Sequence, residues 1–424
     1  MSALSDPVKL PCGLVFPNRL VKAAMAEVLA GFQNAPNESL LNVYGQWAKG
    51  EWGGLLTGNV QVDVNHLGSP FDPALHGEYT AADSSPDSAL LSTWRKYAET
   101  CQAHGTPALV QLCHPGRQSL RFAGKRGIFA SPIAPSAIPM DMGSGLIQRF
   151  LRWFVFPAPR EMDQKDIDTV TRQFVDAARV MSDAGFSGVE LHGAHGYLID
   201  QFLNPKSNIR TDSYGGSAEN RAKFALDILR QTRAVVPPNF AIGIKFNSAD
   251  YNSDSFEDTM TQIRLLVEAG IDFVEISGGS YEDPKMFDMG SDSEPQPETK
   301  SKSTVAREAF FLEFASAVRT RFPTLTLMLT GGFRSRAGAE YALSQNACDI
   351  IGIGRPAAID PAFPKTLLDE SLDEKDAQMK LKKVGVPALV KWIPLTAVGA
   401  GVETTYYANQ IARIAKGLKT ILPV

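Results

Sequence analysis

The sequence contains few cysteines and no close pair of them. Its four cysteines, Cys12, Cys101, Cys113 and Cys348, are widely separated and form no CxxC motif. Zinc ribbons and iron-sulfur clusters need closely spaced thiolates, and small disulfide-stabilised folds need many more of them. We therefore exclude these classes and expect four reduced, mostly buried thiols.

Long apolar runs and clusters of one charge are also missing. The nearest approach to a membrane span, residues 392–402, is shorter than the roughly 20 apolar residues that a bilayer requires. Residues 1–13 lack the charged start and apolar core of a secretory signal. The 42 basic and 46 acidic residues give a net charge of -4 and the basic ones are scattered, so a nucleic-acid surface is not expected. These absences predict a cytoplasmic protein without stable membrane insertion that acts on small molecules.

The sequence does contain a repeated alternation of β-branched runs and amphipathic segments. Eight short apolar runs occur in order, at residues 19–25, 54–60, 108–113, 188–191, 241–246, 273–277, 325–329 and 349–353. Segments with apolar residues three and four positions apart lie between them, at residues 169–184, 218–235, 255–269 and 303–321. Eight such units predict an α/β fold, a (β/α)₈ TIM barrel formed as one domain by residues 1–424. A doubly wound sheet is less consistent with the sequence, because no glycine fingerprint follows the first run.

Two segments exceed what such a barrel needs. Residues 114–163 separate the third strand from its helix, where a connection of about 2 to 6 residues is usual. Because active sites of these barrels lie at the carboxyl ends of the strands, we interpret this insertion as a lid over the barrel mouth. Within it, residues 146–156 are bulky, apolar and basic, so contact with a membrane surface is an alternative. Residues 361–424 form a helical C-terminal extension, which we expect to wrap the outside of the barrel with Tyr406 and Tyr407 as packing residues.

Polar side chains gather where the fourth strand ends. His192, His195 and Tyr197 follow the run at 188–191, and the chain has only six histidines. Two imidazoles could donate hydrogen bonds to a carbonyl oxygen or an anion, while a phenol supplies a proton. Metal ligation is the competing use, although no HExxH motif accompanies the pair, and a satisfied core position is the other.

Glycines follow the seventh and eighth strands, where barrels often bind phosphate. Gly331 and Gly332 lie in TGGF, and Gly354 and Arg355 lie in GIGRPA. Glycine lets backbone N–H groups approach an anion closely, and Arg355 can add a charge-assisted hydrogen bond. A purely structural turn is the alternative. The GxGxxA match is a poor dinucleotide fingerprint, because no second half of a Rossmann sheet follows it.

Two polar side chains interrupt apolar strands. Lys245 is a cation within IGIKF, and burying it without a partner would be costly. It therefore needs an anion, which a ligand or one of the carboxylates Glu275 and Glu190 can supply. Gln111 lies in the third strand (LVQLC), where its amide could recognise a ring that has both donors and acceptors.

Together these segments resemble the Old Yellow Enzyme family of FMN-dependent ene reductases. The resemblance covers residues 10–363. It is carried by NRLVKAAM at 18–25, VQLCHPGR at 110–117, HGAHGYLIDQFL at 192–203, SNIRTDSYGGSAENRAKF at 207–224 and GIGRP near the end. It implies the same barrel, with FMN bound without a covalent bond at the barrel mouth. The dienoyl-CoA reductase subtype, which carries an iron-sulfur cluster, is excluded because no cysteine cluster is present.

The resemblance also implies a role for each site residue. Flavin contacts are implied for Ala24, Met25, Ala26, Asn59, Gln111 and Lys245, and phosphate contacts for Gly331, Gly332, Gly354 and Arg355. His192 and His195 would bind the substrate carbonyl oxygen, and Tyr197 would be the proton donor. The sequence departs from the family at two of these positions. Lys245 replaces the usual arginine, and Ala26 replaces a threonine or cysteine that hydrogen-bonds the flavin, with Glu27 as the nearest polar substitute.

The activity implied by the resemblance is a two-step oxidoreduction. NADH or NADPH would reduce FMN, which would pass a hydride to the β-carbon of an α,β-unsaturated carbonyl compound while Tyr197 protonates the α-carbon; a quinone is a further acceptor. No metal is implied. The alternatives are a metal-dependent barrel hydrolase that uses the two histidines, and a flavin-binding protein without turnover.

Overall fold

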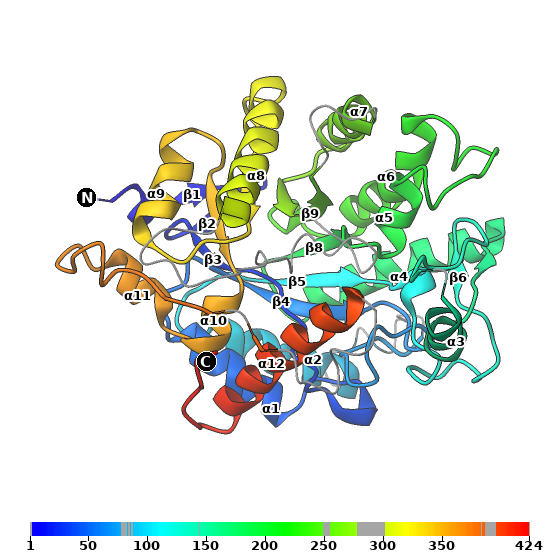
Figure 1. Ribbon diagram of the computed structural model, residues 1–424, viewed down its shortest axis with the longest axis horizontal. Coiled ribbons are helices and arrows are strands. Elements are labelled where there is room, and N and C mark those ends of the chain that lie inside the picture. The colour runs from blue at the N-terminus through cyan, green and yellow to red at the C-terminus, as the bar shows by residue number, and fades with distance from the viewer. Residues whose placement is uncertain are drawn as a thin grey trace.

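The central sheet of the protein is a closed barrel of eight parallel strands. The computed structural model describes residues 2–77, 83, 85, 88–143, 145–248, 255–277, 302–382, 384–385 and 396–423. Strands that follow one another in sequence are neighbours around the barrel, which is the arrangement predicted for a (β/α)₈ fold (Figure 1). The strands are β3 (Leu20–Lys22), β4 (Gly54–Gln61), β5 (Ala108–Cys113), β8 (Gly188–Gly193), β9 (Ala241–Asn247), β10 (Phe273–Ser277), β11 (Leu327–Thr330) and β12 (Ile350–Ile353).

The predicted strand ends agree with the structure to within a few residues. β5 and β10 coincide with the predicted runs. The largest difference is in the first strand, which was predicted to reach residue 25 but ends at Lys22. The next residues, Ala23 to Met25, leave the strand ladder and line the pocket described below.

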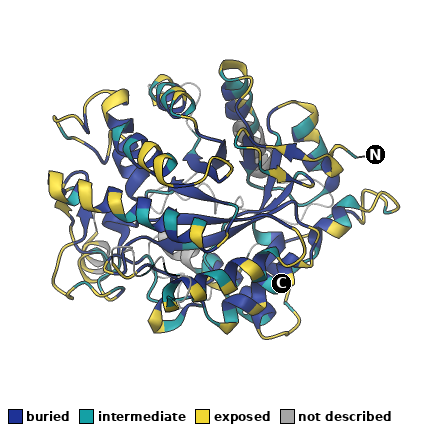
Figure 2. Cartoon of the chain, turned by 180° about the vertical axis from the view of Figure 1, so that it is seen from behind, coloured by how far each residue is buried: buried dark blue, intermediate teal, exposed yellow. Residues whose placement is uncertain are grey.

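Helices surround the barrel, and each buries one face against it. The main outer helices are α1 (Glu38–Ala48), α2 (Ala89–Gln102), α4 (Gln164–Asp183), α6 (Ala218–Val235), α7 (Ser255–Glu268), α8 (Lys302–Arg321) and α9 (Arg336–Ser344). In α4, Ile167, Val170 and Phe174 are buried at helical spacing, and Asp163 and Asp166 cap its first turn reciprocally. Figure 2 shows this pattern, with buried strands inside and exposed residues on the outer faces of the helices.

A short antiparallel hairpin of β1 (Val8–Lys9) and β2 (Val15–Phe16) closes the opposite end of the barrel from the strand carboxyl ends. Val8 and Phe16 pack with Ala241, Phe273 and Ile350, which are the first residues of their strands. The sequence analysis did not anticipate this hairpin. Because it plugs the amino end, the carboxyl end is the one left to bind a ligand.

The insertion and the C-terminal extension add further elements. The insertion contains β6 (Ile133–Ala134), α3 (Leu146–Val155) and β7 (Arg160–Glu161). Short helices α5 (Leu198–Leu203), α10 (Arg355–Ile359) and α11 (Phe363–Leu368) follow barrel strands, and α12 (Thr396–Ala415) contacts α1 and α10. Within the described ranges no helix has the length and apolar character needed to cross a membrane. All four cysteines are free and three of them are buried, in line with the expectation of reduced thiols.

Candidate active site

A pocket with about 1460 Å³ of empty space, part of it open to solvent, lies at the carboxyl ends of the barrel strands. All the residues expected to form the site line this pocket, although they come from seven separate places in the sequence. They are Ala24, Met25, Ala26, Asn59, Gln111, His192, His195, Tyr197, Lys245, Gly331, Gly332, Gly354 and Arg355. The structure thus brings these residues together, while the role of each stays a prediction.

His192, His195 and Tyr197 form one aromatic group in the pocket. The ring centroids of His192 and His195 are 5.1 Å apart, and those of His192 and Tyr197 are 4.6 Å apart. His192 belongs to β8, and Tyr197 is the residue immediately before α5, so the turn between strand and helix aims all three side chains into the pocket. His195 Nε2 lies 3.0 Å from Ser277 Oγ at the end of β10, a pocket residue that no sequence motif indicated.

The backbone of His195 is held in an unusual conformation. Its φ is 60°, in the left-handed region that non-glycine residues rarely adopt. Its N–H donates to Asn247 Oδ1 at 3.3 Å, and its carbonyl accepts from Gln118 Nε2 at 3.0 Å. Asn247 in turn donates to Asp200 at 2.8 Å. These bonds from three separate elements hold the strained turn and thereby fix the direction of the imidazole.

Both imidazoles of the pair are neutral at physiological pH. Burial and the positive charge of Lys245 lower the pKa of His195 to about 3. Burial, His195 and Lys245 lower the pKa of His192 well below its ordinary value. A neutral imidazole carries one N–H, so each ring can donate one hydrogen bond. Tyr197 is itself 7% exposed, and its hydroxyl accepts a hydrogen bond from Asn59 Nδ2 at 3.3 Å.

Lys245 lines the pocket, and its ammonium group lies close to two glutamate side chains. It forms an ion pair with Glu275 and lies 4.0 Å from Glu190, and both glutamates are completely buried. The sequence left two possible anions for Lys245, a ligand or a carboxylate. The structure shows a carboxylate, that of Glu275. Gln111 joins this network by donating to Glu190 Oε1 at 2.6 Å.

The three ionisable groups of this network have pKa values that are shifted in different directions. Burial alone would lower the pKa of Lys245, but the charges of Glu275 and Glu190 more than compensate and raise it. Burial and repulsion by Glu275 raise the pKa of Glu190 well above its ordinary value, whereas the Lys245 charge outweighs burial and lowers that of Glu275. These directions favour an ammonium at Lys245 paired with the carboxylate of Glu275, and they favour the protonated form of Glu190.

The other end of the pocket has the features of an anion site. Gly331 and Gly332 have φ values of 148° and 80°, a backbone that a side chain would strain. Gly354 and Arg355 lie beside them in the pocket wall. Arg355 Nη1 is 3.1 Å from Glu403 Oε1, and Glu403 belongs to α12.

The expectation that the C-terminal extension only wraps the outside of the barrel is wrong. Glu403, Thr404, Tyr407 and Ala408 of α12 line the pocket, because residues three and four positions apart share one face of a helix. Tyr407 is 2% exposed and its hydroxyl has no hydrogen-bond partner among the described residues. Burial raises its pKa to about 12, so it remains a hydrogen-bond donor.

Tyr406, by contrast, is a packing residue as expected. Its hydroxyl donates to the carbonyl of Ile421 at 2.5 Å, near the end of the chain. The two adjacent tyrosines differ because consecutive helical positions point about 100° apart. The sequence had a usable signal in the spacing of 403, 404, 407 and 408, but it did not show which barrel face the helix covers.

The interpretation of residues 114–163 as a lid stays a prediction. No described residue of this insertion lines the pocket. Figure 1 shows α3 at the edge of the molecule, away from α12. An amphipathic pattern indicates that a helix has an apolar face, but it does not say which surface that face meets.

Glu27 does not replace the missing flavin donor at position 26. Its carboxylate accepts hydrogen bonds from the Tyr44 hydroxyl and from the Gly58 N–H, the latter at 2.7 Å. Glu27 is 2% exposed and is absent from the pocket lining, whereas Ala26 lines it. The only side-chain group that position 26 presents to the pocket is therefore the methyl group of Ala26.

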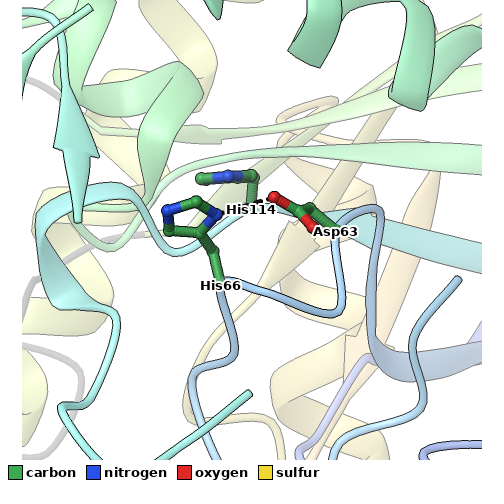
Figure 3. A group of neighbouring side chains, drawn as sticks. All are labelled: Asp63, His66 and His114. Carbon is green, nitrogen blue, oxygen red and sulfur yellow. Dashed lines mark hydrogen bonds and ion pairs between the residues drawn. The ribbon is translucent and has the colours of Figure 1, made fainter. Parts of the chain in front are cut away.

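A second polar cluster, of Asp63, His66 and His114, joins the loops that follow β4 and β5 (Figure 3). His66 Nδ1 lies 2.7 Å from Asp63 Oδ2; although burial alone would raise the pKa of Asp63, His66 holds it at about 2. The N–H of Gly116 donates to His114 Nδ1 at 3.1 Å, so neutral His114 carries its proton on Nε2. A protonated nitrogen cannot ligate a metal, so the hydrogen bonds favour a structural role for this cluster.

Proteins of similar sequence are described as flavin oxidoreductases. Residues 4–374 match the model of the NADH:flavin oxidoreductase / NADH oxidase family. NADH-dependent flavin oxidoreductases of Hypocrea jecorina and Talaromyces variabilis are each 42% identical, over 94% and 97% of this chain and 97% and 98% of their own lengths. A relative with the same description from Neonectria sp. is 42% identical over 95% of this chain, which spans 53% of that protein.

Solved structures share the fold at lower identity. Morphinone reductase superimposes with a TM-score of 0.67 at 24% identity, over 86% of this chain and 89% of its own. An Old Yellow Enzyme homologue from Zymomonas mobilis superimposes with a TM-score of 0.66 at 22% identity, over 90% and 98%. With the family model spanning most of the sequence, the chain belongs to the NADH:flavin oxidoreductase / NADH oxidase family, the Old Yellow Enzyme family of flavin-dependent oxidoreductases.

Proposed function

We propose that the protein uses FMN and NADH to reduce the carbon-carbon double bond of α,β-unsaturated carbonyl compounds. The observation that carries this proposal is the convergence of two neutral imidazoles and a phenol, His192, His195 and Tyr197, in the pocket that also holds the glycine and arginine anion site. An ene reduction needs donors for a carbonyl oxygen, an acid for a carbon, and a hydride source held beside both.

The pocket residues suit FMN at both of its ends. At the ring end, the backbone of Ala24, Met25 and Ala26 and the side chains of Asn59 and Gln111 line the pocket with groups that can donate and accept hydrogen bonds. At the other end, Gly331, Gly332, Gly354 and Arg355 would bind the phosphate. The unpartnered hydroxyl of Tyr407 is a further donor there. A buried donor without a partner is costly, which favours a ligand acceptor in this position.

A bound flavin would supply the hydride chemistry that couples oxidation of the nicotinamide coenzyme to reduction of the substrate β-carbon. His192 and His195 donate hydrogen bonds to the carbonyl oxygen and stabilise the negative charge that develops on it. Tyr197 gives its proton to the α-carbon, and solvent later restores that proton. General acid catalysis of this kind typically contributes a factor of about 10² to 10⁴.

The choice of NADH over NADPH rests on the relatives. Three fungal proteins at 42% identity are described as NADH-dependent flavin oxidoreductases. A quinone is a second class of acceptor for the same pocket, because its carbonyl oxygen can occupy the position between the two imidazoles.

The metal-hydrolase alternative has little support at this site. Within the described ranges, the group of three metal-ligating side chains in mutual reach is that of Asp63, His66 and His114. His192 and His195 belong to no such group. The other alternative is a protein that binds flavin without turnover. The two-step measurement described next distinguishes it from an enzyme.

The test is an anaerobic two-step measurement on the purified holoprotein. NADH should bleach the flavin absorbance, and a cyclic enone should restore it with formation of the saturated ketone. Bleaching without reoxidation by any enone or quinone would contradict the proposed oxidative step. A protein that neither contains FMN nor takes it up would contradict the whole assignment.

A further inference from the structure

An exposed apolar patch on the insertion has no role in the pocket chemistry. Seven of the fifteen large apolar side chains that are exposed among the described residues lie between positions 122 and 154. We define the insertion patch by six of them: Phe122, Ile128, Phe129, Phe150, Trp153 and Phe154. Phe129 is 92% exposed and Trp153 63%. Contiguous exposed apolar surface of this kind marks an interaction site on a soluble protein.

Four of the five aromatic members of the patch lie close to one another. The ring centroids of Phe122 and Phe154 are 5.3 Å apart, and Phe150 lies 6.0 Å from Trp153 and 6.1 Å from Phe154. Residues 150, 153 and 154 share one face of α3 because they are three and four positions apart. The patch is therefore one surface built from a helix and the loop beside it.

Hydrogen bonds hold this surface in place. Arg121 donates to the carbonyls of Ile128, Trp153 and Phe154 at 3.0, 2.7 and 3.1 Å, and its guanidinium lies 5.5 Å from the Trp153 ring. The backbone N–H of Arg121 also donates to the carbonyl of Val155 at 2.9 Å. The loop and the helix are thus joined with their apolar side chains outward.

The two segments that form the patch carry charge of one sign. Residues 119–130 contain Arg121, Lys125 and Arg126, residues 145–156 contain Arg149 and Arg152, and neither segment contains an aspartate or a glutamate. The whole chain has a net charge of -4, so five basic residues without an acidic one are a local departure from its composition. The partner that fits is apolar and carries negative charge.

We propose that the insertion patch docks this protein on the surface of an anionic membrane, with α3 lying in the plane of the interface. Aromatic side chains favour the boundary between headgroups and acyl chains, and basic side chains beside them attract anionic lipids. α3 has ten residues, a length of about 15 Å, which suits a surface helix and not a spanning one. This inference does not depend on the proposed function.

A second copy of the chain fits the patch less well. A symmetric dimer would place the same surface of each subunit against the other, and the basic residues of each copy would then lie near those of its partner. Like charges brought together in this way oppose association. The barrel pocket is not the partner either, because none of the patch residues lines it.

The test is flotation of the holoprotein with vesicles of phosphatidylcholine alone and with phosphatidylserine added. We expect binding to the anionic vesicles that weakens when NaCl is raised from about 0.1 M to about 1 M, which shortens the Debye length from about 10 Å to about 3 Å. Replacing Phe150 and Trp153 together by serine should reduce the bound fraction at least tenfold. The matched control is Tyr341→Ser on α9, which removes an aromatic ring 57% exposed elsewhere and should leave binding unchanged.

A charge variant tests the electrostatic part separately. Arg149→Gln should weaken binding to anionic vesicles roughly fivefold, the effect of one basic residue near such a surface, whereas Lys416→Gln, directly after α12, should not. All variants should keep the flavin content and NADH oxidation of the parent. Absence of vesicle binding, equal binding to neutral vesicles, or a dimer that the Phe150 and Trp153 replacements convert to monomers would each overturn the proposal.

Discussion

Glu403 of α12 lies 3.1 Å from Arg355, the arginine expected to bind the cofactor phosphate, and both side chains line the same pocket. The Glu403 side chain is 8% exposed. A carboxylate at this place competes with a phosphate for the same guanidinium. The C-terminal helix therefore contributes both a donor, Tyr407, and an anion, Glu403, to the phosphate end of the pocket.

Replacing Glu403 by glutamine should tighten FMN binding. Glutamine keeps a hydrogen-bonding oxygen for Arg355 but removes a negative charge that repels the phosphate, so we expect a decrease of about tenfold in the Kd, or about 1.4 kcal/mol. Titration of the apoprotein with FMN, followed by flavin fluorescence, measures this change. Riboflavin has no phosphate, and its Kd should stay the same. Weaker FMN binding would instead mean that Glu403 acts by orienting Arg355.

Tyr407→Phe should have the opposite effect. It removes a donor to a charged phosphate, an interaction of about 1.5 to 3 kcal/mol, so the Kd for FMN should rise at least tenfold while that for riboflavin is unchanged. Tyr406→Phe is the matched control, because the Tyr406 hydroxyl bonds to Ile421 at the surface. If Tyr407→Phe weakens both ligands equally, the hydroxyl does not face the phosphate.

The charge network beneath the pocket should show a non-additive effect on the flavin potential. Glu190→Gln replaces a neutral acid, and in Glu275→Gln the remaining Glu190 can release its proton to balance Lys245, so neither single variant changes the net charge. The double variant leaves Lys245 unbalanced and should raise the midpoint potential by roughly 30 mV or more, since 30 mV corresponds to about 1.4 kcal/mol for two electrons. Dye-equilibrated reduction measures the potential. A shift in either single variant as large as that in the double variant would contradict a shared proton.

The barrel could be predicted from sequence because its signals are local. The run at 273–277 and the helix at 218–235 have clear periodicities and coincide with the structure. The grouping of His192, Lys245 and Arg355 followed from topology, because parallel strands place their carboxyl ends at one mouth. Each of these inferences needs only the order of elements and the direction of the strands.

Other features depend on tertiary packing that the sequence does not encode locally. The helical period of α12 defines its faces, but only its docking against α1 and α10 turns Tyr407 into the pocket. The direction of Glu27 is decided by Tyr44, which lies on a different element. The surface that the insertion covers could not be predicted for the same reason, since an apolar helix face does not specify what it contacts.

The stability of the holoprotein should fall as the pH decreases below about 6.5. His195 has a pKa of about 3 when folded and about 6.5 when unfolded, so between these values the unfolded state binds more protons. Its contribution to the free energy of unfolding is present above pH 6.5 and decreases by about 1.4 kcal/mol per pH unit as the pH falls. Urea unfolding at pH 7 and pH 5 should show a smaller loss in His195→Asn, by about 2 kcal/mol. An identical pH dependence in the two proteins would mean that His195 is protonated in the fold.

The last prediction concerns Tyr197, whose hydroxyl accepts from Asn59 and whose ring packs on His192. Tyr197→Phe removes the proton donor but keeps the ring, so reduction of the flavin by NADH should be almost unchanged. Reoxidation by an enone should slow by about 10² to 10⁴, because carbon protonation then depends on solvent. A quinone is protonated on oxygen, which exchanges protons with water readily, so its reduction should slow much less. Stopped-flow measurement of both half-reactions separates these rates. Equal slowing with enone and quinone would show that the phenol positions the acceptor and does not act as the acid.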